Sequence, residues 1–331
     1  MNTNKKSLYN LITYALLIIG FLIIMSLTTM KLTSRHFNSL LVPICVNIIL
    51  AISLNLVVGF LGELSLGHAG FMSIGAYAGC LFSIYTQNIF SVSIRFPLAL
   101  LFGGIVASLF GLIIGIPVLR LKGDYLTIVT HAFGEILRSV IINLNFTGGA
   151  SGLKGTPQDS TFVIAFILVM ITLFFITNLV DSKYGRTIMS LRDNRIASEA
   201  CGINANYYKL VTFIISAFFA GIAGVLYGHN FSILDAGTFG YNKSIEILVI
   251  VVLGGMGNIR GSIISAIIIT ILPEILRFSS DYRMLIYSLV LIAMMLFSSS
   301  PSFASLRISL DFKQKHTLKN DKKINGGEVN E

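Results

Sequence analysis

The residues best suited to ionic chemistry lie in one hydrophilic stretch near the middle of an otherwise apolar chain. The stretch runs from Asp181 to Asn204, and its charged members are Asp181, Lys183, Arg186, Arg192, Asp193, Arg195 and Glu199. No nucleophile–base arrangement accompanies these cations and carboxylates, so they suit ion pairing rather than covalent catalysis. Contact with another protein or with lipid headgroups is the chemistry this stretch predicts.

The spacing of these residues predicts a short amphipathic helix from Gly185 to Cys201. At about 100° per residue, one narrow face of that helix carries Arg192, Arg195 and Glu199. A small apolar stripe beside that face is formed by Met189, Ile196 and Ala200. Gly202 follows as a C-terminal stop. Three interpretations fit this pattern: a solvated loop helix, a helix lying on anionic lipid, and a helix docked into another cytoplasmic protein.

A second charged group lies inside an apolar segment, where charge is costly and suggests a function. His131, Glu135 and Arg138 stand four and three residues apart, so they share one face of a helix. They could line or gate a pore, or they could lock this segment to a neighbouring helix. Glu274 and Arg277 repeat the three-residue spacing near the end of another apolar segment, where a structural pairing is favoured.

Composition places the chain among integral membrane proteins. It is 54% hydrophobic and only 12% charged, with a mean hydropathy of +0.82. The net charge of +9 is spread over loops and tails between apolar runs, which argues against a nucleic-acid-binding face. We therefore expect an all-α polytopic bundle of about ten transmembrane helices, with short re-entrant segments where the runs are weak.

The apolar runs give specific boundaries for these spans. The predicted spans are Leu8–Met30, Leu40–Val58, Leu66–Thr86, Pro97–Leu119, Asp124–Leu144, Thr161–Val180, Lys209–His229, Ser244–Leu253, Ser262–Arg277 and Tyr282–Phe297. With both termini in the cytoplasm, 16 of the 24 lysines and arginines lie inside, 7 lie outside, and Arg138 lies within a span. This asymmetry agrees with the positive-inside rule. The prediction is a permease domain over residues 1–310, a cytoplasmic loop over 181–208 and a polar, disordered cytoplasmic tail over 311–331.

Motifs for ATP hydrolysis, metal binding and disulfide formation are missing from the sequence. In "GGASGLKGT" (Gly148–Thr156), a leucine and a glycine interrupt the order that a phosphate-binding loop needs. The five histidines are scattered, and the three cysteines, Cys45, Cys80 and Cys201, have no paired spacing. We expect this chain to be no enzyme and to bind no metal or cofactor.

Two glycine-rich turns resemble each other and follow apolar runs on the predicted cytoplasmic side. They read "VVGFLGELSLG" (Val57–Gly67) and "VVLGGMGNIRG" (Val251–Gly261). Close helix packing explains small residues of this kind, and an internal duplication is an alternative. If these segments line a path through the membrane, the polar side chains that would contact cargo are Ser65, His68 and Tyr77.

Several blocks resemble the branched-chain amino acid ABC transporter permeases, and most closely the M-type of that family's two permease subunits. The blocks are "YGRTIMSLRDNRIASEACGIN", "GFLGELSLGHAGFMSIGAYAG", "LRLKGDYLTIVTHAFGEILR", "TGGASGL", "VVLGGMGNIRG", "LPEILR" and "YRMLIYSLVLIAMMLF". They occur in order from about Leu40 to Phe297. The chain departs from the family's usual pattern at Glu63, His131 and Arg195, which bears on substrate preference and docking detail.

The resemblance implies the function of a permease subunit in the bacterial plasma membrane. Such a subunit pairs with a second permease, with two cytoplasmic ATPases that use ATP and magnesium, and with an extracytoplasmic binding protein that delivers leucine, isoleucine or valine. The charged stretch would then be the ATPase-coupling segment, through Arg186, Arg192, Arg195, Glu199 and Gly202. The alternatives are an importer of urea, short amides or a sugar, a secondary transporter, which has no need of the charged helix, and a lipid-modifying membrane enzyme, for which no catalytic cluster is found.

Overall fold

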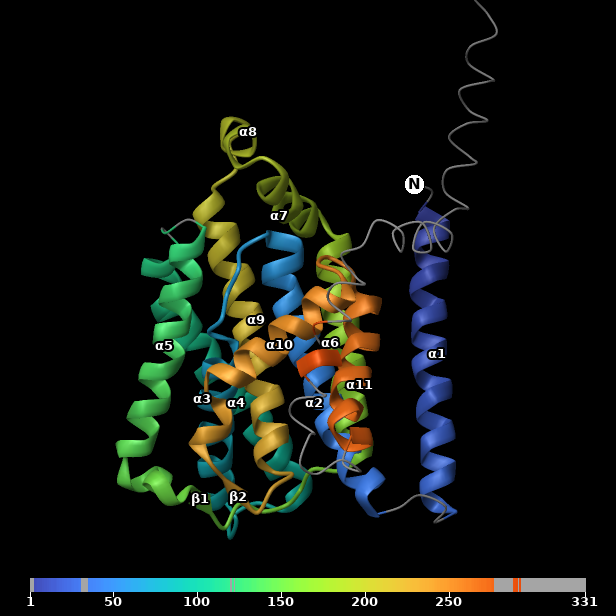
Figure 1. Cartoon of the computed structure of the whole chain (residues 1–331), viewed down its shortest axis with the longest axis vertical. Helices are drawn as coiled ribbons and strands as arrows, with labels where there is room; N and C mark the ends of the chain where they lie inside the picture. Colours follow the sequence, from blue (N-terminus) through green and yellow to red (C-terminus); the bar gives the residue numbers. More distant parts are fainter. Residues whose placement is uncertain are drawn as a thin grey trace, which may run out of the picture. The chain divides into compact units, whose positions relative to one another are not determined.

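The structure is a computed structural model that describes residues 3–30, 35–119, 121, 123–276, 288–290 and 292 (Figure 1). The chain divides into two units, Met1–Ile271 and Leu272–Glu331, and only the first is described at length. Its long helices are α1 (Thr3–Thr29), α2 (Arg35–Asn55), α3 (His68–Tyr85), α4 (Val92–Val118), α5 (Asp124–Asn143), α6 (Phe162–Asp181), α9 (Ala205–Gly228), α10 (Tyr241–Gly254) and α11 (Ile259–Ile275), the last of which continues into the second unit. The predicted tail lies outside the described residues.

Short elements connect these helices. A π-helix, η1 (Leu56–Leu61), continues α2, and two short helices, α7 (Lys183–Asp193) and α8 (Arg195–Ala200), link α6 to α9. The 3-10 helices are η2 (Asn145–Thr147), η3 (Gly149–Ser151) and η4 (Ala236–Phe239). Two antiparallel strands, β1 (Leu153–Lys154) and β2 (Ile233–Leu234), pair Leu153 with Leu234. Figure 1 shows α7 and α8 at the opposite end of the helices from β1 and β2.

The described residues confirm an all-helical polytopic membrane protein but not the predicted count of ten spans. Five helical segments are long and apolar enough to cross a bilayer, and they are Phe37–Leu61, Val92–Val118, Asp124–Asn143, Phe162–Asp181 and Ala205–Gly228. The apolar part of α1, Thr13–Thr28, is shorter. The predicted span at Ser244–Leu253 belongs to α10, which has 14 residues. Most of the predicted span over 282–297 lies outside the described residues.

The core forms where α3, α4 and α9 approach each other through glycines. A methyl group on Gly75 of α3 would lie 2.3 Å from the Cα atom of Gly221 in α9. A methyl group on Gly224 would lie 2.0 Å from the carbonyl oxygen of Met72. Because lipid tails are as apolar as leucine, close packing of this kind is the main force available to bring membrane helices together. α2 is also deeply buried, with side chains such as Ile49 and Leu50 fully covered.

Substitution of Gly75 by valine should destabilise the helix bundle because the added side chain would meet the backbone of α9. Overpacking usually costs about 1–3 kcal/mol, so the melting temperature in detergent should fall. The matched control is Gly20→Val in α1, where an added Cβ has no neighbour within 4 Å. Equal melting temperatures for the two variants would contradict this account of the core.

Candidate functional site

The projecting helix α7 is firmly attached to the membrane helices below it. Its first turn is capped by Ser182, whose hydroxyl accepts a hydrogen bond from the Gly185 backbone N–H. A Cβ on Gly185 would lie 2.1 Å from the carbonyl oxygen of Val180, so this position requires glycine. The Tyr184 hydroxyl donates to the carbonyl oxygen of Tyr208 at 2.9 Å. Burial raises the pKa of Tyr184 to about 12, so the phenol stays neutral at physiological pH.

The prediction of one helix from Gly185 to Cys201 is wrong, because Asn194 divides the segment into α7 and α8. Asn194 has an extended backbone (φ −155°, ψ 100°). Its side chain accepts a hydrogen bond from the Ala197 N–H at 3.0 Å, which caps α8. Asparagine is among the residues that favour the N-cap, and this signal in the sequence marks the break.

The short helix α8 forms the exposed tip of the segment. Arg195 Nε donates to Glu199 Oε1 at 2.7 Å, so two of the three residues predicted to share a helix face form an ion pair. Of the predicted apolar stripe, Ile196 is 81% exposed and Ala200 is exposed, whereas Met189 lies in α7 and is half-buried. The three residues therefore do not form one continuous face. Gly202 ends the helix with φ 83°, which confirms the predicted stop.

Arg192 does not share a face with Arg195 and Glu199, since the break at Asn194 separates it from them. Its Nη1 atom donates to the carbonyl oxygen of Gly59 in η1 at 3.0 Å. The Nε and Nη2 atoms donate to Asp193 Oδ1 at 3.0 and 2.9 Å. Arg186 lies on the exposed surface of α7, and its Nη1 atom donates to the carbonyl oxygen of Asp181 at 3.3 Å. The Arg192 side chain is 38% exposed, so its contact with η1, and not burial, distinguishes it from the other predicted coupling residues.

The structure brings together the three polar residues predicted on α5. Arg138 Nε donates to Glu135 Oε2 at 2.9 Å, and both side chains are about one-third exposed. The other Glu135 oxygen accepts the backbone N–H of Tyr241 at 3.0 Å. The ring of His131 lies 4.6 Å from the ring of Tyr241. Glu135 thus contacts the start of α10 while keeping its ion pair. The two predicted roles of this group, lining or gating a pore and locking α5 to a neighbour, both stay predictions.

Ser65, His68 and Tyr77 are buried and hydrogen-bonded within the subunit. The Ser65 hydroxyl accepts the Gly67 N–H at 3.4 Å, and His68 Nε2 lies 2.8 Å from the Ser53 hydroxyl. The Tyr77 hydroxyl donates to the carbonyl oxygen of Leu234 at 2.9 Å. These contacts hold helices and the β2 segment in place, and the role of the three residues in a pore stays a prediction.

The sequence analysis did not predict two buried ion pairs that the structure contains. Lys209 Nζ of α9 donates to Glu63 Oε1 in the loop after η1. Arg95 Nη2 of α4 donates to Asp159 Oδ2 at 2.6 Å, with both side chains at most 10% exposed. The partners lie 146 and 64 residues apart, so no local spacing reveals them. Arg95 lies two residues before the predicted apolar run but inside α4, which begins at Val92, so a longer predicted span would have shown an arginine that requires a partner.

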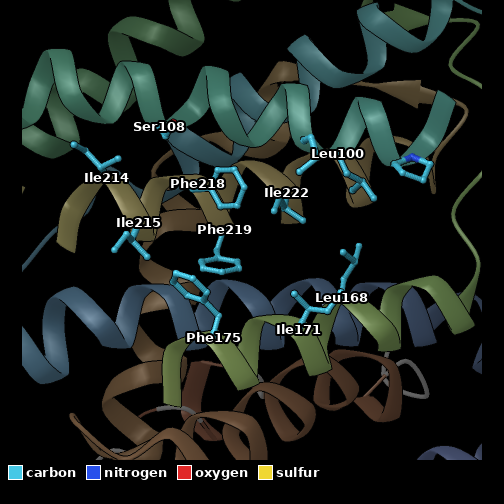
Figure 2. Close-up of a pocket in the computed structure, with 12 residues that line it drawn as sticks. Leu100, Ser108, Leu168, Ile171, Phe175, Ile214, Ile215, Phe218, Phe219 and Ile222 are labelled. Atoms are coloured by element: carbon cyan, nitrogen blue, oxygen red, sulfur yellow. The ribbon is translucent and has the colours of Figure 1, made fainter. Parts of the chain in front are cut away.

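One cavity in the structure is apolar. It has a volume of about 480 Å³ and lies between α4, α6 and α9, with side chains such as Leu100, Phe175 and Phe218 along it (Figure 2). Ser108 is the one lining residue with a polar side chain. A groove of this kind suits hydrocarbon and offers no anchor for a charged amino acid.

Removing one member of the Glu135–Arg138 pair should destabilise the protein more than neutralising both. Arg138→Gln leaves a carboxylate whose ionic partner is gone, and because both side chains are about one-third exposed the cost should be at most about 1 kcal/mol. The double variant with Glu135→Gln leaves no unpaired charge. We expect the melting temperature of the single variant to be below that of the double variant, with Ser139→Ala close to the unmodified protein. A double variant less stable than the single one would show that the ionic pairing is unimportant.

Comparison with known proteins identifies related sequences but no related structure. The probable branched-chain amino acid transport permease protein LivM of Methanocaldococcus jannaschii is 28% identical over 201 residues, covering 54% of this chain and 58% of that protein. The ribose import permease protein RbsC of Haemophilus influenzae is 31% identical over 125 residues, covering 35% and 38%. No solved structure matches.

A higher similarity links the chain to a bacterial permease. The high-affinity branched-chain amino acid transport system permease protein LivM of Escherichia coli is 32% identical over 245 residues, covering 63% of this chain and 58% of that protein. The chain therefore spans less than two thirds of this relative's length. A family model described as the permease component of a branched-chain amino acid transport system matches residues 37–298. This chain belongs to that family of membrane permease components, which are transport subunits rather than enzymes.

Proposed function

We propose that this chain is one permease subunit of an ATP-driven importer for leucine, isoleucine and valine in the bacterial plasma membrane. Family membership and the likeness to LivM support the cargo class. The observation that carries the coupling mechanism is the anchored projection of α7 and α8, which ends in the exposed Ile196 and the Arg195–Glu199 pair. A secondary transporter has no use for such a docking segment.

The proposal assigns the driving reaction to separate subunits. Two cytoplasmic ATPases would bind ATP and magnesium and contact α8, while this chain would bind no cofactor. A second permease would complete the path, and an extracytoplasmic binding protein would deliver the amino acid. Rigid-body movement of α7 and α8 with the ATPases suits a switching mechanism, because the segment is tied to its own membrane helices.

The proposed orientation puts both termini and the α7–α8 projection in the cytoplasm. Buried contacts alter the charge count on which this orientation rests. Lys209, counted inside, and Arg95 and Lys243, counted outside, are held in helices by hydrogen bonds to other side chains. Their removal takes one cation from the inner count and two from the outer count, so the inner excess remains.

The polar side of α5 is the best candidate in this chain for part of the path. α5 is the least apolar of the five spans, and only 22% of its 18-residue apolar stretch is buried within the subunit. Glu135, Arg138, Ser139 and Asn143 lie on it. Exposing such groups to hydrocarbon is costly, which supports a position facing the second permease or an aqueous path.

The cargo assignment can be tested by uptake of radiolabelled leucine in cells that lack this chain and in cells where it is restored. Restored uptake should need ATP and should be inhibited by isoleucine and valine. Competition by ribose or urea separates the alternatives, since the likeness to RbsC keeps a sugar as the second candidate. If leucine uptake does not depend on this chain while ribose uptake does, the amino acid assignment is wrong.

The docking role of α8 predicts a specific loss of ATPase binding. Ile196→Asp places a carboxylate where an 81% exposed apolar side chain now stands, and it should reduce co-purification of the ATPase subunits and abolish uptake. The permease should still insert and keep its melting temperature, because Ile196 packs little within the chain. Lys183→Ala, an exposed change at the start of α7, is the matched control. Full ATPase binding by the Ile196 variant would defeat this assignment.

A further inference from the structure

The two glycine-rich turns singled out in the sequence meet in space. Gly59 of η1 lies against Gly257, which belongs to the loop between α10 and α11. A Cβ on Gly59 would lie 2.2 Å from the Gly257 backbone nitrogen. Asn55 connects the same two segments: its Oδ1 accepts the Gly257 N–H at 2.8 Å, and its Nδ2 donates to the Ser262 hydroxyl at 3.0 Å. The turns therefore move as one unit unless these contacts break.

Arg192 reaches this junction from the projecting helix α7. Its Nη1 atom bonds the carbonyl oxygen of Gly59, and a Cβ on Gly257 would be 3.6 Å from that nitrogen. A Cβ on Gly62 would lie 2.6 Å from Cγ of Arg192, so the arginine stem passes directly over this glycine. The carboxylate of Asp193 holds the rest of the guanidinium through two hydrogen bonds. Asp193, the next residue in α7, thus orients the guanidinium group of Arg192 toward η1.

Physical chemistry explains why an arginine suits this position. Gly59 lies in the last turn of the α2–η1 helix, which ends at Gly62 with φ 80°. Carbonyl groups in a last turn lack partners within the helix, and a cation there also meets the negative end of the helix dipole. π-helical turns are rare and often mark functional segments. Arg192 therefore caps a helix end that has an unusual, π-helical geometry.

We infer that Arg192 transmits movement of the coupling segment to the membrane helices, by linking α7 to the junction of η1 with the α10–α11 loop. This inference rests on the proposed function, and it gives Arg192 a role distinct from that of the exposed α8 residues. Arg192 is a positioning residue that acts on the path without contacting cargo or ATP. Displacement of α7 pulls on the Gly59 carbonyl and, through Asn55 and Gly257, on the start of α11.

The Lys209–Glu63 pair supplies the fixed point for this movement. Glu63 follows η1 directly and is held by Lys209 in the first turns of α9. The segment from Leu56 to Glu63 is consequently held at two places by two different helices, α7 and α9. The Tyr184 hydroxyl also ties α7 to α9 through Tyr208. A movement of α7 that bends this contact would change η1, because both attachments of the segment are ionic or charge-assisted contacts.

The inference can be tested with the purified complex of this chain and its partner subunits in proteoliposomes, by measuring leucine uptake and ATP hydrolysis together. Arg192→Ala should leave ATPase binding and ATP hydrolysis in place while uptake per ATP hydrolysed falls at least tenfold. Arg192→Lys keeps the charge but cannot bond Gly59 and Asp193 with the same planar group, so it should show a partial fall. Lys183→Ala, on the same helix but without a contact to η1, should keep the ratio of the unmodified complex.

Each result for the Arg192 variants either supports or overturns the role of Arg192 in transmission. An unchanged ratio in Arg192→Ala would overturn the inference, and loss of ATPase binding would make Arg192 a docking residue instead. If Arg192→Ala does not accumulate in the membrane, Arg192→Lys carries the test, and a ratio equal to that of the unmodified complex overturns the inference. Failure of the unmodified complex to show ATP-dependent uptake would count against the proposed function itself, separately from Arg192.

Discussion

Pairing of charges among apolar helices is the constraint on which the rest of this structure depends. A lone charge in a medium of low dielectric is costly, so each ionisable side chain there needs a partner. Arg95 meets Asp159, and Lys209 meets Glu63. Lys243 of α10 reaches Asn47 of α2 and Glu246 of its own helix. Most of these contacts join elements far apart in the sequence, so satisfying the charges also fixes which helices and loops are neighbours.

Close packing at glycines holds helices together where no ion pair joins them. The close approach of α3 to α9 at Gly75 and Gly221 leaves no room for side chains, and it brings backbone atoms within van der Waals range. Such packing is rigid because a small displacement either opens a void or creates a clash. The junction at Gly59 and Gly257 uses the same close approach, but hydrogen bonds of Asn55 and Arg192 hold it.

Local patterns predicted the helices better than they predicted the site. The α5 boundaries, Asp124–Leu144 from the sequence and Asp124–Asn143 in the structure, agree because apolar periodicity and a glycine before the helix are local signals. The ion pair between Glu135 and Arg138 was also predictable, since three residues separate the partners. The contact from Glu135 to the start of α10 was not, because the two residues that form it are 106 positions apart.

The division of the coupling segment shows how one missed capping residue changes a functional argument. With a single helix, Arg192, Arg195 and Glu199 would form one docking face. Asparagine favours the N-cap over the helix interior. The Asn194 side chain therefore caps a new helix, α8, and the extended backbone at Asn194 gives α8 a different direction from α7. In the proposed mechanism, docking is assigned to α8 at the exposed tip and transmission to α7 against the membrane helices. In that proposal a partner that moves α8 acts on η1 through α7 and Arg192, and this route requires a stiff α7. Its caps, the buried Ile188 and Leu191 and the Tyr184 hydrogen bond all supply that stiffness.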